Sequence, residues 1–236
     1  MNALDPQPEL VLFDLDDTLC DYASARWLRL RIAFDQALDR LPRRPSVDLD
    51  MLARESIEMH PHGVDHFHEL LAKHEVEHRE AVEHAQHWYR TNRFYGLRLF
   101  PDALETLVAT RRALPGRRIG MITNGPAETQ RAKIELLGIR SYFDFILISG
   151  EFGVAKPDRK IFEEATSRGT AGPDSSVFIG DSPEFDMAGA RNAGMPGVWM
   201  NPTGQQWSHP DPRPGFEART LGDVRTLLGG DRSAPK

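Results

Sequence analysis

The sequence has little of several features that would direct it to a particular class of protein. Its 236 residues include one cysteine, Cys20, so no disulfide can form within the chain, which suits a reducing compartment. No apolar run approaches the roughly 18 residues that a membrane helix needs. The first residues lack the basic start and the apolar stretch of a secretory signal. We therefore expect a cytoplasmic globular protein.

The sequence also has no excess of positive charge. Lys and Arg number 29 against 35 Asp and Glu, which gives a formal net charge of -6 at pH 7. Nucleic acids and anionic membrane surfaces favour basic patches, so this balance argues against both as partners. The length fits one large domain, or a core domain with a smaller accessory one, as a monomer or a dimer.

Five short apolar runs, rich in β-branched and aromatic residues, predict strands. They are Leu10–Phe13, Ile119–Ile122, Phe145–Ile148, Val177–Ile179 and Val198–Met200. Helical stretches are expected at 101–114, 128–137, 158–167, 186–193 and 221–228. Strands that alternate with helices predict an α/β fold, here a Rossmann-like parallel sheet with right-handed crossovers.

The segment 21–97 interrupts this pattern and carries no strand signal. Apolar residues recur in it at helical spacing from Trp27 to Leu41, and further helices are expected near 48–59, 65–76 and 78–94. The sequence "LPRRPSVD" separates the first of these helices from the second. We therefore expect a core domain formed by residues 1–20 and 98–236, with an all-helical cap domain at 21–97.

The first predicted strand runs directly into a cluster of acidic residues, "DLDDTLCD". Carboxylates this close together resist joint ionisation unless a cation lies among them. In an open parallel sheet, ligands bind beyond the carboxyl ends of the strands, so the residues that follow each strand are expected at one rim. These residues are Asp14, Asp16, Thr123, Asn124, Lys156, Asp181 and Asp186. Taken singly, a strand-end Asp often caps a helix and a Lys is usually solvated.

Taken together, these side chains suit a phosphate ester and a divalent cation. Hard oxygen ligands at this density suit Mg²⁺, which often shares a substrate phosphate as a ligand. Lys156 offers a point charge for a phosphate oxygen, Thr123 a hydroxyl donor and Asn124 a backbone N–H. A carboxylate at the strand end can then attack phosphorus and form an aspartyl phosphate.

In order and spacing, four motifs resemble those of the haloacid dehalogenase superfamily: "DLDDT", "ITN", "AKPD" and "GDSPEFD". The resemblance covers residues 9–20 and 98–228, with the insert where that family keeps a helical cap. It implies that Asp14 is the nucleophile and Asp16 the acid/base. It further implies that Thr123 and Lys156 hold phosphate.

The resemblance also implies a Mg²⁺ site and assigns the remaining acidic residues. The cation would be held by the side chains of Asp14 and Asp181 and by the backbone carbonyl of Asp16. Asp186 would support the waters of the metal or orient Lys156. We read Asp17 as solvated and Cys20 as small apolar filler.

The acid/base position separates reactions within this superfamily. Its dehalogenases lack an Asp there, because a halide leaves without a proton, so Asp16 implies a phosphate-ester hydrolase. The stretch beginning "ITNGPAETQRAKIELLG" is similar to helical-capped nucleoside 5′-monophosphate phosphatases and sialic acid 9-phosphate phosphatases. A small phosphorylated metabolite, a nucleoside monophosphate or a sugar phosphate, is the expected substrate. The aromatic residues of the insert either stack a base or form its own core: Trp27, Phe67, Trp88, Tyr89, Phe94 and Tyr95.

Three other functions remain open at this level. Eight of the nine histidines lie in the insert, and His74–His78, "HEVEH", matches the H-E-x-x-H pattern of zinc proteases. Were this segment helical, the two histidines would share a face and could bind zinc, although so short a pattern often arises by chance. A phosphosugar mutase uses the same two aspartates, and a non-catalytic phospho-ligand binding protein can share the fold.

Overall fold

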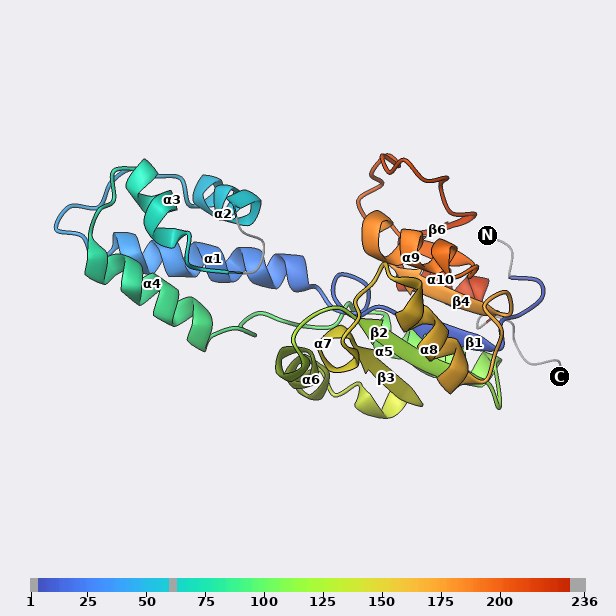
Figure 1. Ribbon diagram of the computed structural model, residues 1–236. Helices are drawn as coiled ribbons and strands as arrows, with labels where there is room; N and C mark the ends of the chain where they lie inside the picture. Colours follow the sequence, from blue (N-terminus) through green and yellow to red (C-terminus); the bar gives the residue numbers. More distant parts are fainter. Residues whose placement is uncertain (1–3, 60–62, 230–236) are drawn as a thin grey trace. The chain divides into compact units, whose positions relative to one another are not determined.

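The computed structural model describes residues 4–59 and 63–229 and divides into two compact units (Figure 1). The first unit contains the residues up to Asp21 and those from Leu99 onward, and the second is Tyr22–Arg98. Within the described residues, no helix combines the length and the apolar character needed to cross a membrane.

The first unit is built on a parallel sheet with the strand order β3-β2-β1-β4-β5-β6. Its strands are β1 (Leu10–Phe13), β2 (Arg118–Thr123), β3 (Phe145–Ile148), β4 (Ser176–Gly180), β5 (Gly197–Met200) and β6 (Phe216–Ala218). The predicted α/β class is confirmed, and all five expected strands are present. The edge strand β6 was not expected, because three residues are too few to show a strand pattern in the sequence.

Helices connect the strands as the alternating pattern predicts. They are α5 (Ala103–Ala113), α6 (Ala127–Leu136), α7 (Ser149–Phe152), α8 (Arg159–Gly169), α9 (Ala188–Asn192) and α10 (Leu221–Leu227), with short helical turns η1 (Arg140–Tyr142) and η2 (Pro183–Met187). From β1 to β3 the chain moves toward one edge of the sheet, and from β4 to β6 toward the other. The helices α8 and α9 pack against each other, whereas α10, which follows the last strand, packs against α5.

The strand order reverses beside β1, and this reversal positions the functional site. β1 is hydrogen-bonded to β2 on one side and to β4 on the other. Because the chain leaves β1 and β4 in opposite directions, a crevice opens at their carboxyl ends. β1 is buried on both faces, as a central parallel strand should be. Part of this core is a hydrophobic cluster that includes Leu10, Leu12, Phe162 and Phe178.

The second unit is helical and has a hydrophobic core of its own. It contains α1 (Tyr22–Leu38), α2 (Leu49–Met59), α3 (Phe67–Lys73) and α4 (Arg79–Thr91). The ring centroid of Phe67 lies 4.7 Å from that of Phe34 and 5.8 Å from that of Tyr89. Two of the candidate base-stacking residues, Phe67 and Tyr89, therefore belong to this core. Tyr95, by contrast, is 51% exposed.

The structure does not support the zinc interpretation of "HEVEH". His74 caps the C-terminus of α3, His78 caps the N-terminus of α4, and Glu75 between them has a φ of 62°. The two histidines therefore do not share a helix face. His74 pairs with Glu55, while His78 accepts a hydrogen bond from the Ala81 N–H. A tight turn between two helices, which five residues of sequence cannot reveal, explains the difference.

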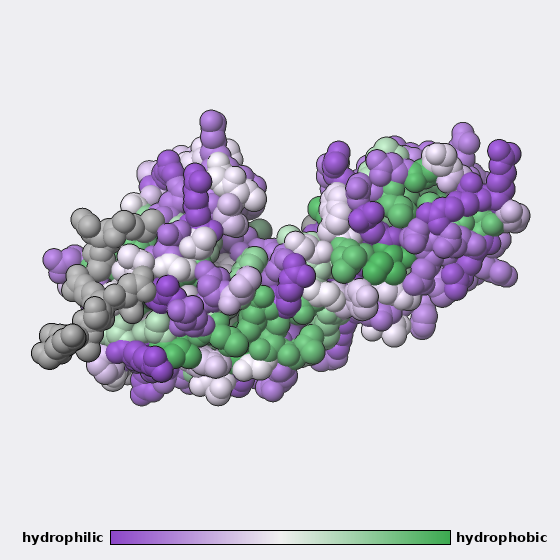
Figure 2. Space-filling view, turned by 180° about the vertical axis from the view of Figure 1, so that it is seen from behind, coloured by the Kyte–Doolittle hydropathy of each residue, from purple (hydrophilic) through white to green (hydrophobic). Residues whose placement is uncertain are grey.

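On the face drawn in Figure 2, both units carry many hydrophilic residues, and apolar side chains gather into patches between them. The exposed large apolar side chains among the described residues include Tyr95 in the helical unit and Leu136 and Phe185 in the α/β unit.

Candidate active site

The register of the sheet brings the ends of β1, β2 and β4 to one level. Phe13, the last residue of β1, pairs with Met121 on one side and with Ile179 on the other. The N–H of Asp14 then donates to the Ile179 carbonyl at 2.9 Å, which holds the first residue after β1 against β4. The residues that follow these three strands consequently meet at one edge of the sheet.

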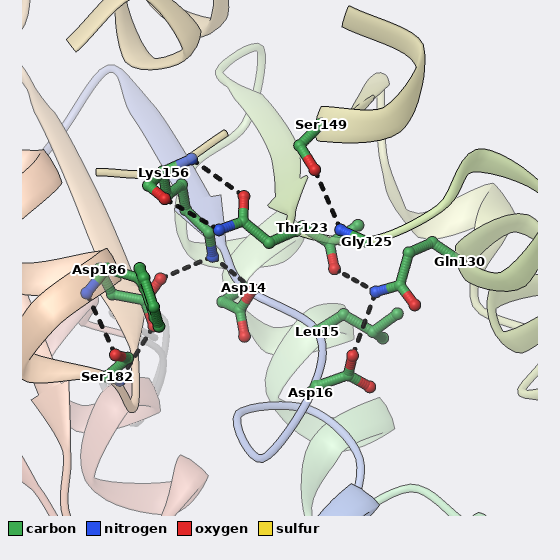
Figure 3. A network of polar contacts seen from close by, with 12 residues as sticks. Asp14, Leu15, Asp16, Thr123, Gly125, Gln130, Ser149, Lys156, Ser182 and Asp186 are labelled. Atoms are coloured by element: carbon green, nitrogen blue, oxygen red, sulfur yellow. Dashed lines mark hydrogen bonds and ion pairs between the residues drawn. The ribbon is translucent and has the colours of Figure 1, made fainter. Parts of the chain in front are cut away.

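Asp14, Lys156 and Asp186 form a buried ionic cluster at this edge (Figure 3). The ammonium Nζ of Lys156 lies 2.5 Å from Asp14 Oδ1 and 2.6 Å from Asp186 Oδ1. All three side chains are almost fully buried, so the attraction between them acts in a medium of low dielectric constant. Burial alone would lower the pKa of Lys156, but the attraction of Asp14 and Asp186 outweighs it and raises the pKa above its usual value. The ammonium group therefore stays charged.

The side chain of Asn124 holds the backbone of Lys156. Its Nδ2 donates to the Lys156 carbonyl at 3.0 Å, and its Oδ1 accepts from the Lys156 N–H at 2.9 Å. This clamp fixes the segment that carries the ammonium toward Asp14. Only the backbone N–H of Asn124 was predicted to take part, because the partner of its side chain lies 32 residues further along the chain.

Asp186 reaches the cluster from η2, a single π-helical turn after β4. Ser182 accepts from the Phe185 N–H, and Pro183 occupies the first position of the turn. Asp186 Oδ2 accepts from the Ser182 N–H at 3.0 Å. Single π turns of this kind are frequent at functional sites. The predicted helix at 186–193 is therefore a π turn followed by α9.

Gly180, at the end of β4, leaves the space that Asp186 occupies. A Cβ atom at this position would lie 2.4 Å from Asp186 Oδ2, a distance that carbon and oxygen do not tolerate. The absence of a side chain at 180 is therefore a condition for the ion pair between Asp186 and Lys156.

We expect Gly180→Ala to displace the Asp186 carboxylate and to lower catalytic turnover by at least about tenfold, because a misplaced group near the reacting atoms costs rate. Overpacking of this kind also destabilises a fold by roughly 1–3 kcal/mol. Turnover and denaturant unfolding are to be measured beside Gly215→Ala, since a Cβ at Gly215 meets nothing within 4 Å. Equal behaviour of the two variants would contradict this account.

Three carboxylates converge at the same point. Oxygen atoms of Asp14, Asp181 and Asp186 all lie within 4.8 Å of one another. Burial and then the neighbouring carboxylates raise the pKa of Asp181 to about 9. Burial also raises the pKa of Asp14 to about 7, against the opposing effect of Lys156.

This donor set fits a divalent cation. One ammonium does not neutralise three carboxylates, and within the described residues no donor contacts the Asp181 carboxylate. Hard, anionic oxygen ligands that repel one another are stabilised by Mg²⁺ or a similar ion, and metal binding displaces their protons.

Asp16 lies apart from this carboxylate group and faces α6. Lys133 Nζ is 2.8 Å from Asp16 Oδ1 and 2.7 Å from Oδ2, and Gln130 Nε2 donates to Oδ2 at 3.1 Å. In Figure 3 the Asp16 carboxylate is directed toward Gln130, away from the Asp14 carboxylate. Gln130 and Lys133 were not among the predicted site residues, although their three-residue spacing, which places them on one helix face, was the available signal.

Thr123, at the end of β2, is 1% exposed and belongs to the same network. Gln130 Nε2 donates to Thr123 Oγ1 at 2.5 Å. A hydroxyl group has one proton to donate and two lone pairs that accept. Because Gln130 uses an acceptor position, the hydroxyl proton of Thr123 remains available for a ligand oxygen.

Two further residues after β1, Asp17 and Cys20, lie outside the cluster of Asp14, Lys156 and Asp186. Asp17 is half-buried with a φ of 58°, and its charge contributes to the raised pKa of Asp181. Cys20 is fully buried, and burial raises the pKa of its thiol far above the usual value, while its Sγ lies 3.7 Å from Asp16 Oδ1.

The haloacid dehalogenase-like hydrolase model matches residues 8–194, and the chain belongs to this family of hydrolases. The chain is 33% identical over 234 residues to the glyceraldehyde 3-phosphate phosphatase of Methanopyrus kandleri. The match covers 94% of this chain and 98% of that protein. The chain is also 29% identical over 234 residues to the N-acylneuraminate-9-phosphatase of Mus musculus, covering 92% of each. A match of 103 residues to the pyrimidine 5′-nucleotidase YjjG of Escherichia coli is 42% identical and covers 43% of this chain and 44% of that one. The family resemblance drawn from the four motifs is confirmed.

A solved structure has the same fold. The HAD-hydrolase YfnB from Bacillus subtilis, bound to magnesium, matches with a TM-score of 0.73 and 24% identity, covering 94% of this chain and 99% of that one. The likeness supports the Rossmann-like sheet with an inserted helical segment.

Proposed function

We propose that the protein is a metal-dependent phosphomonoesterase that acts through an aspartyl-phosphate intermediate on Asp14. The observation that carries this proposal is the buried Asp14 carboxylate at the end of β1, paired with Lys156 and crowded by Asp181 and Asp186. Phosphoryl transfer requires positive charge around the equatorial phosphate oxygens and a nucleophile aligned with the leaving group. A lysine, a hydroxyl group and a candidate cation site around one carboxylate meet these needs.

In the proposed first step, an oxygen of Asp14 forms a bond to phosphorus while the bond from phosphorus to the ester oxygen breaks. The leaving oxygen takes a proton from Asp16 and departs as an alcohol. In the second step, Asp16 takes a proton from water as the water oxygen attacks phosphorus. The bond from phosphorus to Asp14 breaks, and inorganic phosphate leaves with the carboxylate restored. Lys156 and the Thr123 hydroxyl hold phosphate oxygens throughout.

We assign Mg²⁺ to the carboxylates of Asp14 and Asp181, with the backbone carbonyl of Asp16 as a further ligand. Asp186 is assigned to orienting Lys156, since both of its oxygens have protein donors. When bound, the cation supplies positive charge that stabilises the phosphate oxygens in the transition state. The carboxylate cluster and the magnesium-bound relative support this assignment.

The substrate is proposed to be a small phosphorylated metabolite. The relatives named above act on a triose phosphate, a sialic acid phosphate and pyrimidine nucleotides, as their names state. They share a phosphate monoester and differ in everything attached to it. We therefore propose a sugar phosphate or a nucleoside monophosphate, with substrate choice resting in the helical unit, which we assign as a cap domain.

Phosphate release from a panel of sugar phosphates and nucleoside monophosphates, with Mg²⁺ and with chelator, tests this proposal. We expect Mg²⁺-dependent inorganic phosphate as the product. An isomerised sugar phosphate without free phosphate would instead indicate a mutase. Binding without any product would indicate a phospho-ligand binding protein, and either result would overturn the proposal.

A further inference from the structure

The helix α6 buries two polar side chains beside the apolar Ile134 and leaves Leu136 exposed, so its inner face is more polar than that of most surface helices. Gln130 and Lys133 are 1% and 4% exposed, whereas Leu136 is 58% exposed. Buried lysine is rare, because desolvating an ammonium group is costly unless a partner compensates for it. The polar face of α6 therefore needs an explanation beyond packing.

That face makes its contacts with Asp16. Lys133 contacts both carboxylate oxygens, at 2.8 and 2.7 Å, so rotation of the carboxylate loses at least one contact. Gln130 uses one amide nitrogen for both Asp16 and Thr123, at 3.1 and 2.5 Å. The position of the Asp16 carboxylate is thereby tied to that of the Thr123 hydroxyl group (Figure 3).

We propose that Lys133 and Gln130 are positioning residues that hold Asp16 for proton transfer to the leaving oxygen. This inference rests on the proposed phosphatase function, in which Asp16 is the proton donor. In this proposal Lys133 acts through Asp16, and Gln130 acts through Asp16 while it also orients the phosphate-binding hydroxyl of Thr123.

Residues that hold a proton donor affect esters with poor leaving groups more than esters with good ones, whereas residues with a merely structural role affect both equally. An alkyl alcohol is a poor leaving group and needs a proton in the transition state, whereas 4-nitrophenolate leaves readily without one. Loss of a correctly held proton donor should therefore slow alkyl ester hydrolysis selectively. The ratio kcat/KM reports the step that forms the phosphoenzyme, so it isolates this effect from the later hydrolysis.

The test compares Lys133→Met with wild type on an alkyl phosphate and on 4-nitrophenyl phosphate, in the full-length protein with Mg²⁺. We expect kcat/KM to fall about 10–100-fold for the alkyl ester and less than about threefold for the aryl ester. Lys160→Met, which removes an exposed lysine on α8, serves as the matched control and should change neither value.

A double-mutant cycle decides whether Lys133 acts through Asp16. In an Asp16→Asn background, Lys133→Met should cause no further loss on the alkyl ester. Gln130→Leu provides a second variant should Lys133→Met fold poorly, and it should show the same preference for the aryl ester with an added rise in KM.

Equal losses on both esters, or independent losses in the double variant, would overturn this inference while leaving the phosphatase function intact. A wild-type protein that hydrolysed no phosphate ester would overturn the proposed function and this inference together. The two failures are therefore distinguishable in one set of assays.

Discussion

Replacing Asp14 with asparagine should lower Mg²⁺-dependent phosphate release by about 10⁴-fold or more, since removing a covalent nucleophile typically has an effect of this order. An amide oxygen is a weak nucleophile, and no other carboxylate takes the same place at the end of β1. Phosphate release on the best ester of the panel, measured under saturating substrate, checks this expectation.

Loss of folding should not explain that result. Asp14→Asn removes one of three crowded carboxylates and leaves Asp186 to pair with Lys156 at 2.6 Å. We therefore expect the variant to be at least as stable as the wild type in the absence of a cation, as is common where an active site holds like charges together. Asp39→Asn, at an exposed ion pair with Arg44, is the matched control and should retain full activity. Substantial phosphate release by Asp14→Asn would exclude an aspartyl phosphate at this residue.

Removal of divalent cation should abolish phosphate release and should also reveal the electrostatic cost of the site. Burial, with the neighbouring carboxylates, raises the pKa of Asp14 to about 7 and that of Asp181 to about 9. In an unfolded chain both would release their protons near pH 4. Between about pH 4 and pH 9 the folded state therefore binds more protons than the unfolded chain. The free energy of unfolding of the cation-free protein consequently falls as the pH rises across this range. The contribution of these two carboxyl groups to stability is fully present below about pH 4. It is lost as the pH rises through about 7, where Asp14 ionises, and then through about 9, where Asp181 ionises.

Mg²⁺ should reverse this loss, because the cation takes the place of the protons. The rise in Tm caused by Mg²⁺ should accordingly be larger at about pH 9 than at about pH 6. Thermal unfolding with Mg²⁺ and with chelator at both pH values measures the effect. Asp181→Asn should reduce it, whereas Asp144→Asn, remote from the cluster on an ion pair with Arg111, should not. A Mg²⁺ effect independent of pH would contradict the account of the carboxylate cluster.

The sequence alone determined the alternation of strands and helices, and therefore which side chains follow which strand. Parallel strands in register place the residues that follow β1, β2 and β4 at one edge of the sheet. Residues as distant in the sequence as Asp14, Thr123 and Asp181 could therefore be expected to lie close together. The helical insert was equally visible, because four helices in succession leave a periodic apolar pattern without strand signals.

Only the tertiary structure decided which polar side chains face the site from the helices. Gln130 and Lys133 look like ordinary surface residues in the sequence, and the packing of α6 turns them toward Asp16. The Asn124 clamp likewise depends on a segment 32 residues away. Local sequence also failed at "HEVEH", where a turn separates two histidines that a helix would have aligned. Periodicity specifies elements, but the contacts between elements depend on how they pack, and packing is decided by the whole chain at once.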